Sequence, residues 1–149
     1  MPLERRLADL EFGPLRAHQE AALRVFEQHV DRSRFHIVMP PGAGKTLRGA
    51  VMASRVGRRV LVLVPNTATA SQWQRLWETA GSVSVGTDRT LDSDVTVLTY
   101  QALATFDDES VAESAMARLH PNARDFMDRL HGGDPCTLVL DEAHHLAQA

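Results

Sequence analysis

The segment Met39-Pro-Pro-Gly-Ala-Gly-Lys-Thr46 decides the fold of this chain. It follows a short β-rich run, Phe35–Met39, and precedes Thr46–Val56, whose apolar residues recur at helical spacing. Gly42 and Gly44 permit a tight turn that brings backbone N–H groups against phosphate oxygens. The helix that follows points its positive end at the same anion. The segment therefore predicts a phosphate-binding loop between a strand and a helix, against the plainer alternative of a glycine-rich turn that caps a helix.

The two residues after the glycines supply the expected chemistry. Lys45 is the one lysine among 16 basic residues, and its ammonium is a mobile charge for the β- and γ-phosphates of a nucleotide. Thr46 offers a hydroxyl to Mg²⁺. The general motif has a glycine where this chain has Met39. We predict that ATP is bound by Pro41, Gly42, Ala43, Gly44, Lys45, Thr46 and Leu47.

Strands and helices alternate along the rest of the chain. The patterns predict strands at 59–64, 82–85, 94–98 and 136–140, helices at 15–30, 67–80, about 109–119 and 122–131, and a turn at 99–101. Arg59–Val64 is a continuous apolar run, which is typical of a strand buried on both faces of a parallel sheet. We expect one α/β domain over residues 1–149, with a mostly parallel sheet flanked by helices.

Two carboxylates follow the last predicted strand, in Leu138-Val-Leu-Asp-Glu-Ala-His-His145. Parallel sheets bind ligands at the carboxyl ends of their strands, so this segment and the loop are expected to face one crevice. Asp141 is the expected Mg²⁺ partner, and Glu142 is expected to orient and deprotonate the water that attacks the γ-phosphate. An acidic helix N-terminus is the alternative. For His144 and His145, a structural or relay role is favoured over metal ligation, because adjacent residues do not share a helix face.

The composition fits one soluble domain. With 44% hydrophobic residues and a net charge of −3, the chain is neither disordered by composition nor strongly basic. This balance argues against a simple basic coat for nucleic acid but does not exclude a local basic track. Cys136, the single cysteine, favours a reducing compartment and is expected to be a small buried hydrophobe. The first residues lack the apolar stretch of a signal peptide, and no run approaches the ~20 apolar residues of a membrane span. We therefore expect a cytoplasmic protein with no membrane partner.

In combination, these motifs resemble the first RecA-like domain of superfamily 2 helicases. The chain is similar to the DEAH-type members found in type III restriction subunits and DNA translocases. The segments that match in order are 15–19 (the glutamine motif), 39–46 (motif I, in which this family often lacks the first glycine), 62–65 with 71–73 (motif Ia), 97–103 (motif Ib) and 141–144 (motif II). The resemblance runs from about Leu15 to the end of the chain.

The resemblance implies a nucleic-acid-dependent ATPase with ATP and Mg²⁺ as cofactors and DNA, rather than RNA, as the favoured partner. Lys45 and Glu142 would be catalytic, and Gln19 would contact the adenine edge, with Arg16 or Phe12 packing near the base. Pro65, Asn66, Thr99, Tyr100 and Gln101 would lie on the face that follows a nucleic-acid backbone. Trp73 and Trp77, at i,i+4 spacing, are expected to pack in the core rather than stack on bases.

The family also requires a motif III, a second RecA-like domain and the arginine fingers of that domain. These 149 residues contain none of the three, so we expect a domain truncated after motif II that hydrolyses ATP slowly or not at all by itself. A stand-alone nucleotide switch or kinase-like module is the main alternative. A non-catalytic module derived from a decayed motor is a further one, against which the intact Lys45, Thr46, Asp141 and Glu142 argue.

Overall fold

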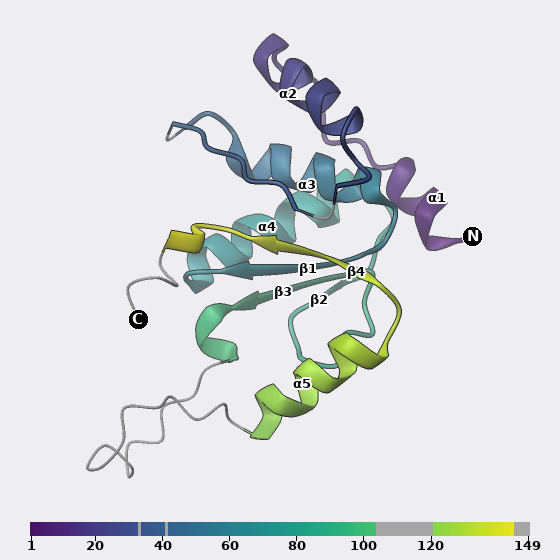
Figure 1. Ribbon diagram of the computed structural model, residues 1–149, viewed down its shortest axis with the longest axis vertical. Helices are drawn as coiled ribbons and strands as arrows, with labels where there is room; N and C mark the ends of the chain where they lie inside the picture. The colour runs from purple at the N-terminus through teal and green to yellow at the C-terminus, as the bar shows by residue number, and fades with distance from the viewer. Residues whose placement is uncertain (33, 41, 104–120, 145–149) are drawn as a thin grey trace.

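The computed structural model describes residues 1–32, 34–40, 42–103 and 121–144 (Figure 1). In chain order the elements are α1 (Leu3–Ala8), α2 (Ala17–Glu27), α3 (Lys45–Val56), β1 (Arg59–Val64), α4 (Thr67–Ala80), β2 (Val85–Gly86), β3 (Val95–Thr99), the 3-10 helix η1 (Tyr100–Ala102), α5 (Pro121–Gly132) and β4 (Cys136–Leu140). The strands form one parallel sheet in the order β2-β3-β1-β4. The α/β fold class is therefore confirmed, and the arrangement is that of an incomplete RecA-like domain.

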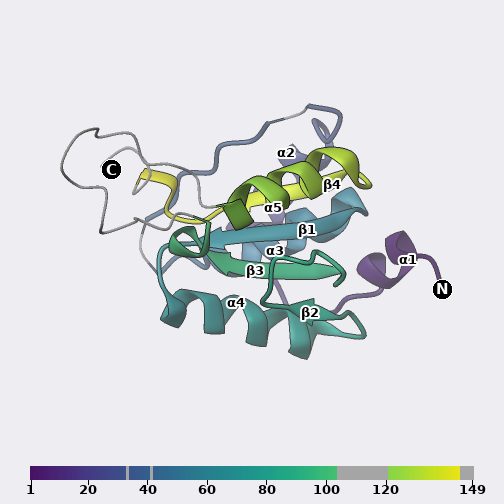
Figure 2. The same cartoon turned by 90° about the horizontal axis from the view of Figure 1, so that it is seen from below.

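Helices cover both faces of the sheet. In Figure 2, α5 lies in front of the strands and α3 behind them. Side chains that alternate along β1 explain the two layers, because Val60, Val62 and Val64 join the core under α3 and α4. Leu61 and Leu63 face the opposite way and pack with Phe126 of α5. The prediction of a strand buried on both faces is confirmed, and each such side chain contributes about 1.5–3 kcal/mol when fully buried.

Most predicted elements are present, some of them with shifted ends. The predicted helix at 67–80 and the strands at 59–64 and 136–140 have the observed bounds of α4, β1 and β4. The predicted strand at 82–85 is reduced to the two-residue β2, and the predicted helix at 109–119 lies outside the described residues. Helix α1 was not predicted. In the part of the chain that the structure describes, no helix combines the length and apolar character needed to cross a membrane.

The predicted strand at 35–39 is wrong, because these residues form no strand. The apolar side chains of Phe35, Ile37 and Val38 are exposed, Val38 by 84% of its surface. A strand needs a neighbouring strand to satisfy its backbone groups, and propensity alone does not supply one. Among the described strands, β4 pairs with β1 alone, and its Leu138 and Leu140 are exposed as well.

Cys136 begins β4 and is half-buried rather than fully buried. It packs against the cluster of Leu61, Leu63, Leu98 and Phe126. Burial raises the pKa of its thiol, because the charged thiolate is poorly solvated there. The expectation of a small hydrophobe in an apolar setting therefore holds in part.

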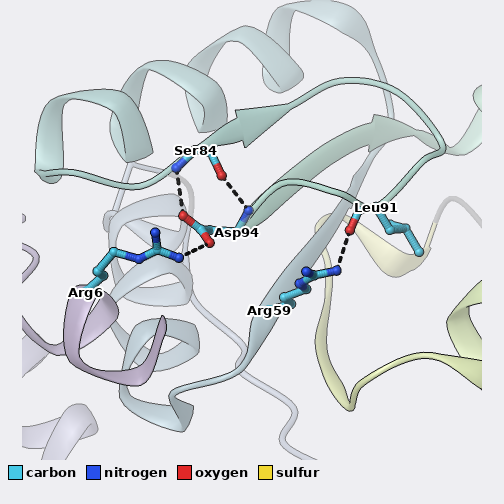
Figure 3. Close-up of polar contacts among 5 residues, drawn as sticks. All are labelled: Arg6, Arg59, Ser84, Leu91 and Asp94. Atoms are coloured by element: carbon cyan, nitrogen blue, oxygen red, sulfur yellow. Dashed lines mark hydrogen bonds and ion pairs between the residues drawn. The ribbon is translucent and has the colours of Figure 1, made fainter. Parts of the chain in front are cut away.

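Asp94, directly before β3, makes hydrogen bonds to α1 and to the residue before β2 (Figure 3). Its carboxylate accepts hydrogen bonds from Arg6 Nη2 at 2.6 Å and from the backbone N–H of Ser84 at 2.9 Å. The Asp94 backbone N–H in turn donates to Ser84 Oγ at 2.8 Å. Nearby, Arg59 donates to the carbonyl of Leu91 at 2.8 Å. These contacts lie at the amino ends of the strands, opposite the edge that carries the predicted site.

We expect Asp94→Ala to lower the free energy of unfolding by about 2–3 kcal/mol, because it leaves Arg6 and the Ser84 N–H without their acceptor. Urea unfolding followed by circular dichroism measures this loss. The matched control is Asp92→Ala, which removes an exposed carboxylate two residues away and should change stability by less than about 0.5 kcal/mol. Equal losses in the two variants would contradict the role given to Asp94.

Candidate functional site

The predicted phosphate loop turns at two glycines and ends at the start of α3. Gly42 and Gly44 have φ angles of 75° and 79°, in the left-handed region that favours glycine. Gly44 is the N-cap of α3, and among the residues that the structure describes no side chain caps this helix. The first N–H groups of α3 are therefore not satisfied by a side-chain cap, which is the arrangement that binds an anion. Pro41 lies outside the described residues.

Gln19 of α2 is held against this loop. Its side chain is 4% exposed. Its Oε1 accepts from the backbone N–H of Arg16 at 2.8 Å, and its Nε2 donates to the carbonyl of Ala43 at 3.5 Å. A Cβ atom at Gly44 would lie 2.6 Å from Gln19 Nε2, so only glycine fits there without a shift. The contact of Gln19 with adenine stays a prediction.

The other residues expected near the base are placed differently. Arg16 is exposed at the N-cap of α2, and its packing against a base stays a prediction. Phe12 packs edge-on against Trp77, with ring centroids 5.3 Å apart, and belongs to the core. The packing of Phe12 near a base stays a prediction.

Lys45 and Glu142, 97 positions apart, meet at the amino end of α3. Lys45 Nζ lies 2.8 Å from Glu142 Oε1, with about a third of each side chain exposed. The hydrogen bond to Glu142 raises the pKa of Lys45, and the charges of Glu142 and Asp141 act in the same direction, against a smaller desolvation effect. The loop and the acidic pair therefore face each other, as expected, although the loop follows no strand among the described residues and is placed instead by α3.

Glu142 adopts an uncommon backbone conformation. Its φ is 53°, in the left-handed region that residues other than glycine rarely occupy. Its second carboxylate oxygen, Oε2, lies 3.3 Å from Nδ1 of His144. The structure thus brings His144 to the acidic pair, whereas His145 lies outside the described residues. A strained residue between two polar contacts is typical of a functional position.

Asp141 is held from three elements. Its backbone N–H donates to the carbonyl of Leu63 in β1 at 2.9 Å. Tyr100 donates its hydroxyl to the Asp141 carbonyl at 2.9 Å, and Trp73 donates its indole N–H to Oδ2 at 2.8 Å. Burial, followed by the charges of Asp141 and Glu142, raises the pKa of Tyr100. The polar contact of Trp73 was not predicted, although a buried indole N–H usually finds an acceptor.

The residues predicted to follow nucleic acid lie at the same edge of the sheet. Pro65 and Asn66 come directly after β1, and Thr99–Gln101 close β3. Asn66 Oδ1 caps α4 by accepting from the backbone N–H of Thr69 at 2.9 Å, and Thr99 Oγ1 accepts from the N–H of Ala102 at 3.2 Å. These side chains therefore shape turns, and their contact with nucleic acid stays a prediction.

The available oxygen ligands fit Mg²⁺ rather than a metal enclosed by protein. Thr46, in the first turn of α3, carries a hydroxyl, and Asp141 carries a carboxylate. No group of three or more His, Cys, Asp or Glu residues suited to a metal occurs among the residues that the structure describes. Mg²⁺ keeps several waters and is commonly bound by one or two protein oxygens together with substrate phosphates.

Comparison with known proteins gives one family. The model of the family described as "Type III restriction enzyme, res subunit" matches residues 12–149. The chain is 34% identical over 107 residues to the TFIIH basal transcription factor complex helicase/translocase XPB subunit of Trypanosoma brucei brucei, a match of 65% of this chain and 11% of that protein. It is 38% identical over 73 residues to the DNA 3'-5' helicase XPB of Mycobacterium tuberculosis, covering 45% of this chain and 13% of the helicase.

A Rad25 protein of Halobacterium salinarum is 32% identical over 152 residues, covering 93% of this chain and 22% of the relative. The chain therefore spans less than a quarter of the length of each of these relatives.

The ion pair predicts the titration of Lys45. Because Glu142 raises the pKa of Lys45 above its ordinary value of 10.5, the substitution Glu142→Gln should lower the pH midpoint of the Lys45 titration. The stabilisation from this pair is present below the unfolded pKa and is lost as pH rises through the raised folded pKa. Lys45 is the one lysine in the chain, so ¹³Cε-labelled lysine gives a single NMR signal. Glu78→Gln, an exposed site on α4, should leave the midpoint unchanged, and an equal shift in both variants would count against the pair.

Proposed function

The chain belongs to the family of the type III restriction enzyme res subunit and is an N-terminal superfamily 2 helicase domain, and on this premise we propose that it binds ATP and Mg²⁺ as the first RecA-like domain of a nucleic-acid-dependent ATPase. The observation that carries the proposal is the 2.8 Å contact between Lys45 and Glu142 at the uncapped end of α3. It joins an ammonium of the kind that binds phosphate to a carboxylate that can act as a general base.

The loop would bind the phosphates through backbone N–H groups of Gly42–Leu47 and through the ammonium of Lys45. When bound, ATP supplies the γ-phosphoryl group and Mg²⁺ the charge that neutralises the phosphate oxygens. Thr46 and Asp141 would hold Mg²⁺, the latter through water. Gln19 would offer its amide to the adenine edge, and its long 3.5 Å bond to Ala43 is weak enough to exchange.

Glu142 would act as the base. As Lys45 turns to the phosphates, the Glu142 carboxylate loses its ion-pair partner and becomes available to orient a water and take its proton. His144, 3.3 Å from the other oxygen, would hold the carboxylate in place. The segment 141–144 thereby supports assignment to the DEAH type, with Lys45 and Glu142 as the residues that touch the reacting groups.

We propose further that the whole protein is a helicase or translocase that acts on DNA. The support is that two relatives are named as a helicase/translocase subunit and as a DNA 3'-5' helicase. Pro65, Asn66 and the turn 99–101 lie beside the acidic pair at the edge where a nucleic-acid backbone would pass. Efficient hydrolysis would require a second RecA-like domain and its arginine finger, in the same protein.

Lys45→Ala should weaken binding of a non-hydrolysable ATP analogue with Mg²⁺ by about 10- to 100-fold, because one charge-assisted hydrogen bond to phosphate is lost. Isothermal titration calorimetry measures the change. Arg75→Ala, which removes a positive charge from the exposed side of α4, serves as the control and should bind like wild type. Unchanged affinity in Lys45→Ala would refute nucleotide binding at this loop.

The 149-residue chain should hydrolyse ATP about 10³- to 10⁵-fold more slowly than a longer form that includes the arginine finger. A coupled phosphate-release assay, with and without DNA, compares the two forms. In the longer form, Glu142→Gln should retain analogue binding and lose hydrolysis by about 10²- to 10⁴-fold. Turnover by the isolated chain at the rate of the longer form would exclude the need for a second domain.

A further inference from the structure

Trp73 makes a polar contact that its place in the core does not require. The residue lies in α4, is 2% exposed, and belongs to the cluster under α3 and α4. Its Nε1 is 2.8 Å from Asp141 Oδ2, although the two residues are 68 positions apart. An indole N–H is only a donor, so the direction of this bond is fixed.

Trp77, one helical turn further along α4, is a buried tryptophan whose contacts are those of packing. It is 0% exposed, and its ring packs edge-on against Phe12. Its Nε1 has no hydrogen-bond partner among the residues that the structure describes. Trp77 therefore serves as an apolar ring, whereas Trp73 combines the same burial with a donated bond to the acidic pair.

The ring of Trp73 is also held from the side of the phosphate loop. A Cβ atom at Gly49 of α3 would lie 2.9 Å from Trp73 Cη2, so the ring lies against the backbone of this helix. The indole is thus in contact with the helix that begins at Lys45, while its N–H reaches Asp141. The backbone of α3 therefore restricts the ring of Trp73 on this side.

The backbone of Asp141 is fixed independently of Trp73. Leu63 accepts its N–H and Tyr100 donates to its carbonyl, each at 2.9 Å. These bonds set the position of the main chain but leave the carboxylate free to rotate about its side-chain torsions. The indole bond restrains the carboxylate, and it uses one of the two oxygens.

We propose that Trp73 is a positioning residue for Asp141: its indole N–H orients the Asp141 carboxylate for Mg²⁺. The inference rests on the proposed function, since it assumes that Asp141 faces Mg²⁺. A hydrogen bond to a carboxylate that serves a metal fixes its rotation, and losing such a partner typically costs 10–100-fold in metal affinity. Trp73 would also connect α4, which begins beside Asn66, to the metal site.

The test compares Trp73→Phe with Trp77→Phe in the 149-residue chain. Both variants keep an aromatic ring in the core, and only the first removes an N–H that has an acceptor. Binding of a non-hydrolysable ATP analogue is measured with Mg²⁺ and with EDTA. Trp73→Phe should weaken the Mg²⁺-dependent binding about 10-fold and leave binding in EDTA unchanged. Trp77→Phe should change neither.

An independent readout uses the two indole N–H signals, since the chain has two tryptophans. Asp141→Asn should shift the ¹H–¹⁵N signal of Trp73 and leave that of Trp77 in place. A Trp73 signal that ignores Asp141→Asn, or equal effects of the two Trp→Phe variants on Mg²⁺-dependent binding, would overturn the positioning role. If the wild-type chain binds the analogue equally with Mg²⁺ and with EDTA, the proposed function fails instead, and the indole signals still decide the contact.

Discussion

The contact between Lys45 and Glu142 is the interaction on which the site depends, because it joins a loop near residue 45 to the end of the last strand. Helix α3 precedes β1 and packs on the sheet through Ala50 and Ala53, so its amino end, with Lys45, lies at the edge where β4 ends and Glu142 follows. Strand β1 pairs with β3 on one side and with β4 on the other. The polar residues that follow these strands then collect at one edge.

The remaining contacts at this edge restrict how the two charged residues move. Gln19 holds the loop through Ala43, and Asp141 is fixed by Leu63, Tyr100 and Trp73. About a third of each side chain in the Lys45–Glu142 pair is exposed, so the pair contributes little to stability after screening by solvent. Under the proposed function, Lys45 exchanges Glu142 for a phosphate, while Asp141 stays fixed beside it.

The sequence predicted those elements whose signal lies in their own residues. Helix α4 was predicted with its observed ends because its apolar residues repeat at helical spacing. The structure adds that Asn66 caps its first turn. The run Phe35–Met39 has strand composition but no strand, because pairing depends on a neighbour that composition does not reveal. Helix α1 was missed since its anchor, Arg6 to Asp94, spans 88 positions. The indole bond of Trp73 was missed for the same reason, whereas its burial followed from i,i+4 spacing.

A crystal structure of the chain with Mg²⁺ and a non-hydrolysable ATP analogue tests the central claim most directly. The account predicts that Lys45 Nζ leaves Glu142 and lies on the β- and γ-phosphates, which rest on the N–H groups at the start of α3. It also predicts Mg²⁺ between the phosphates and the oxygens of Thr46 and Asp141. An analogue bound elsewhere, or a Lys45–Glu142 pair that stays intact beside bound phosphates, would contradict the account.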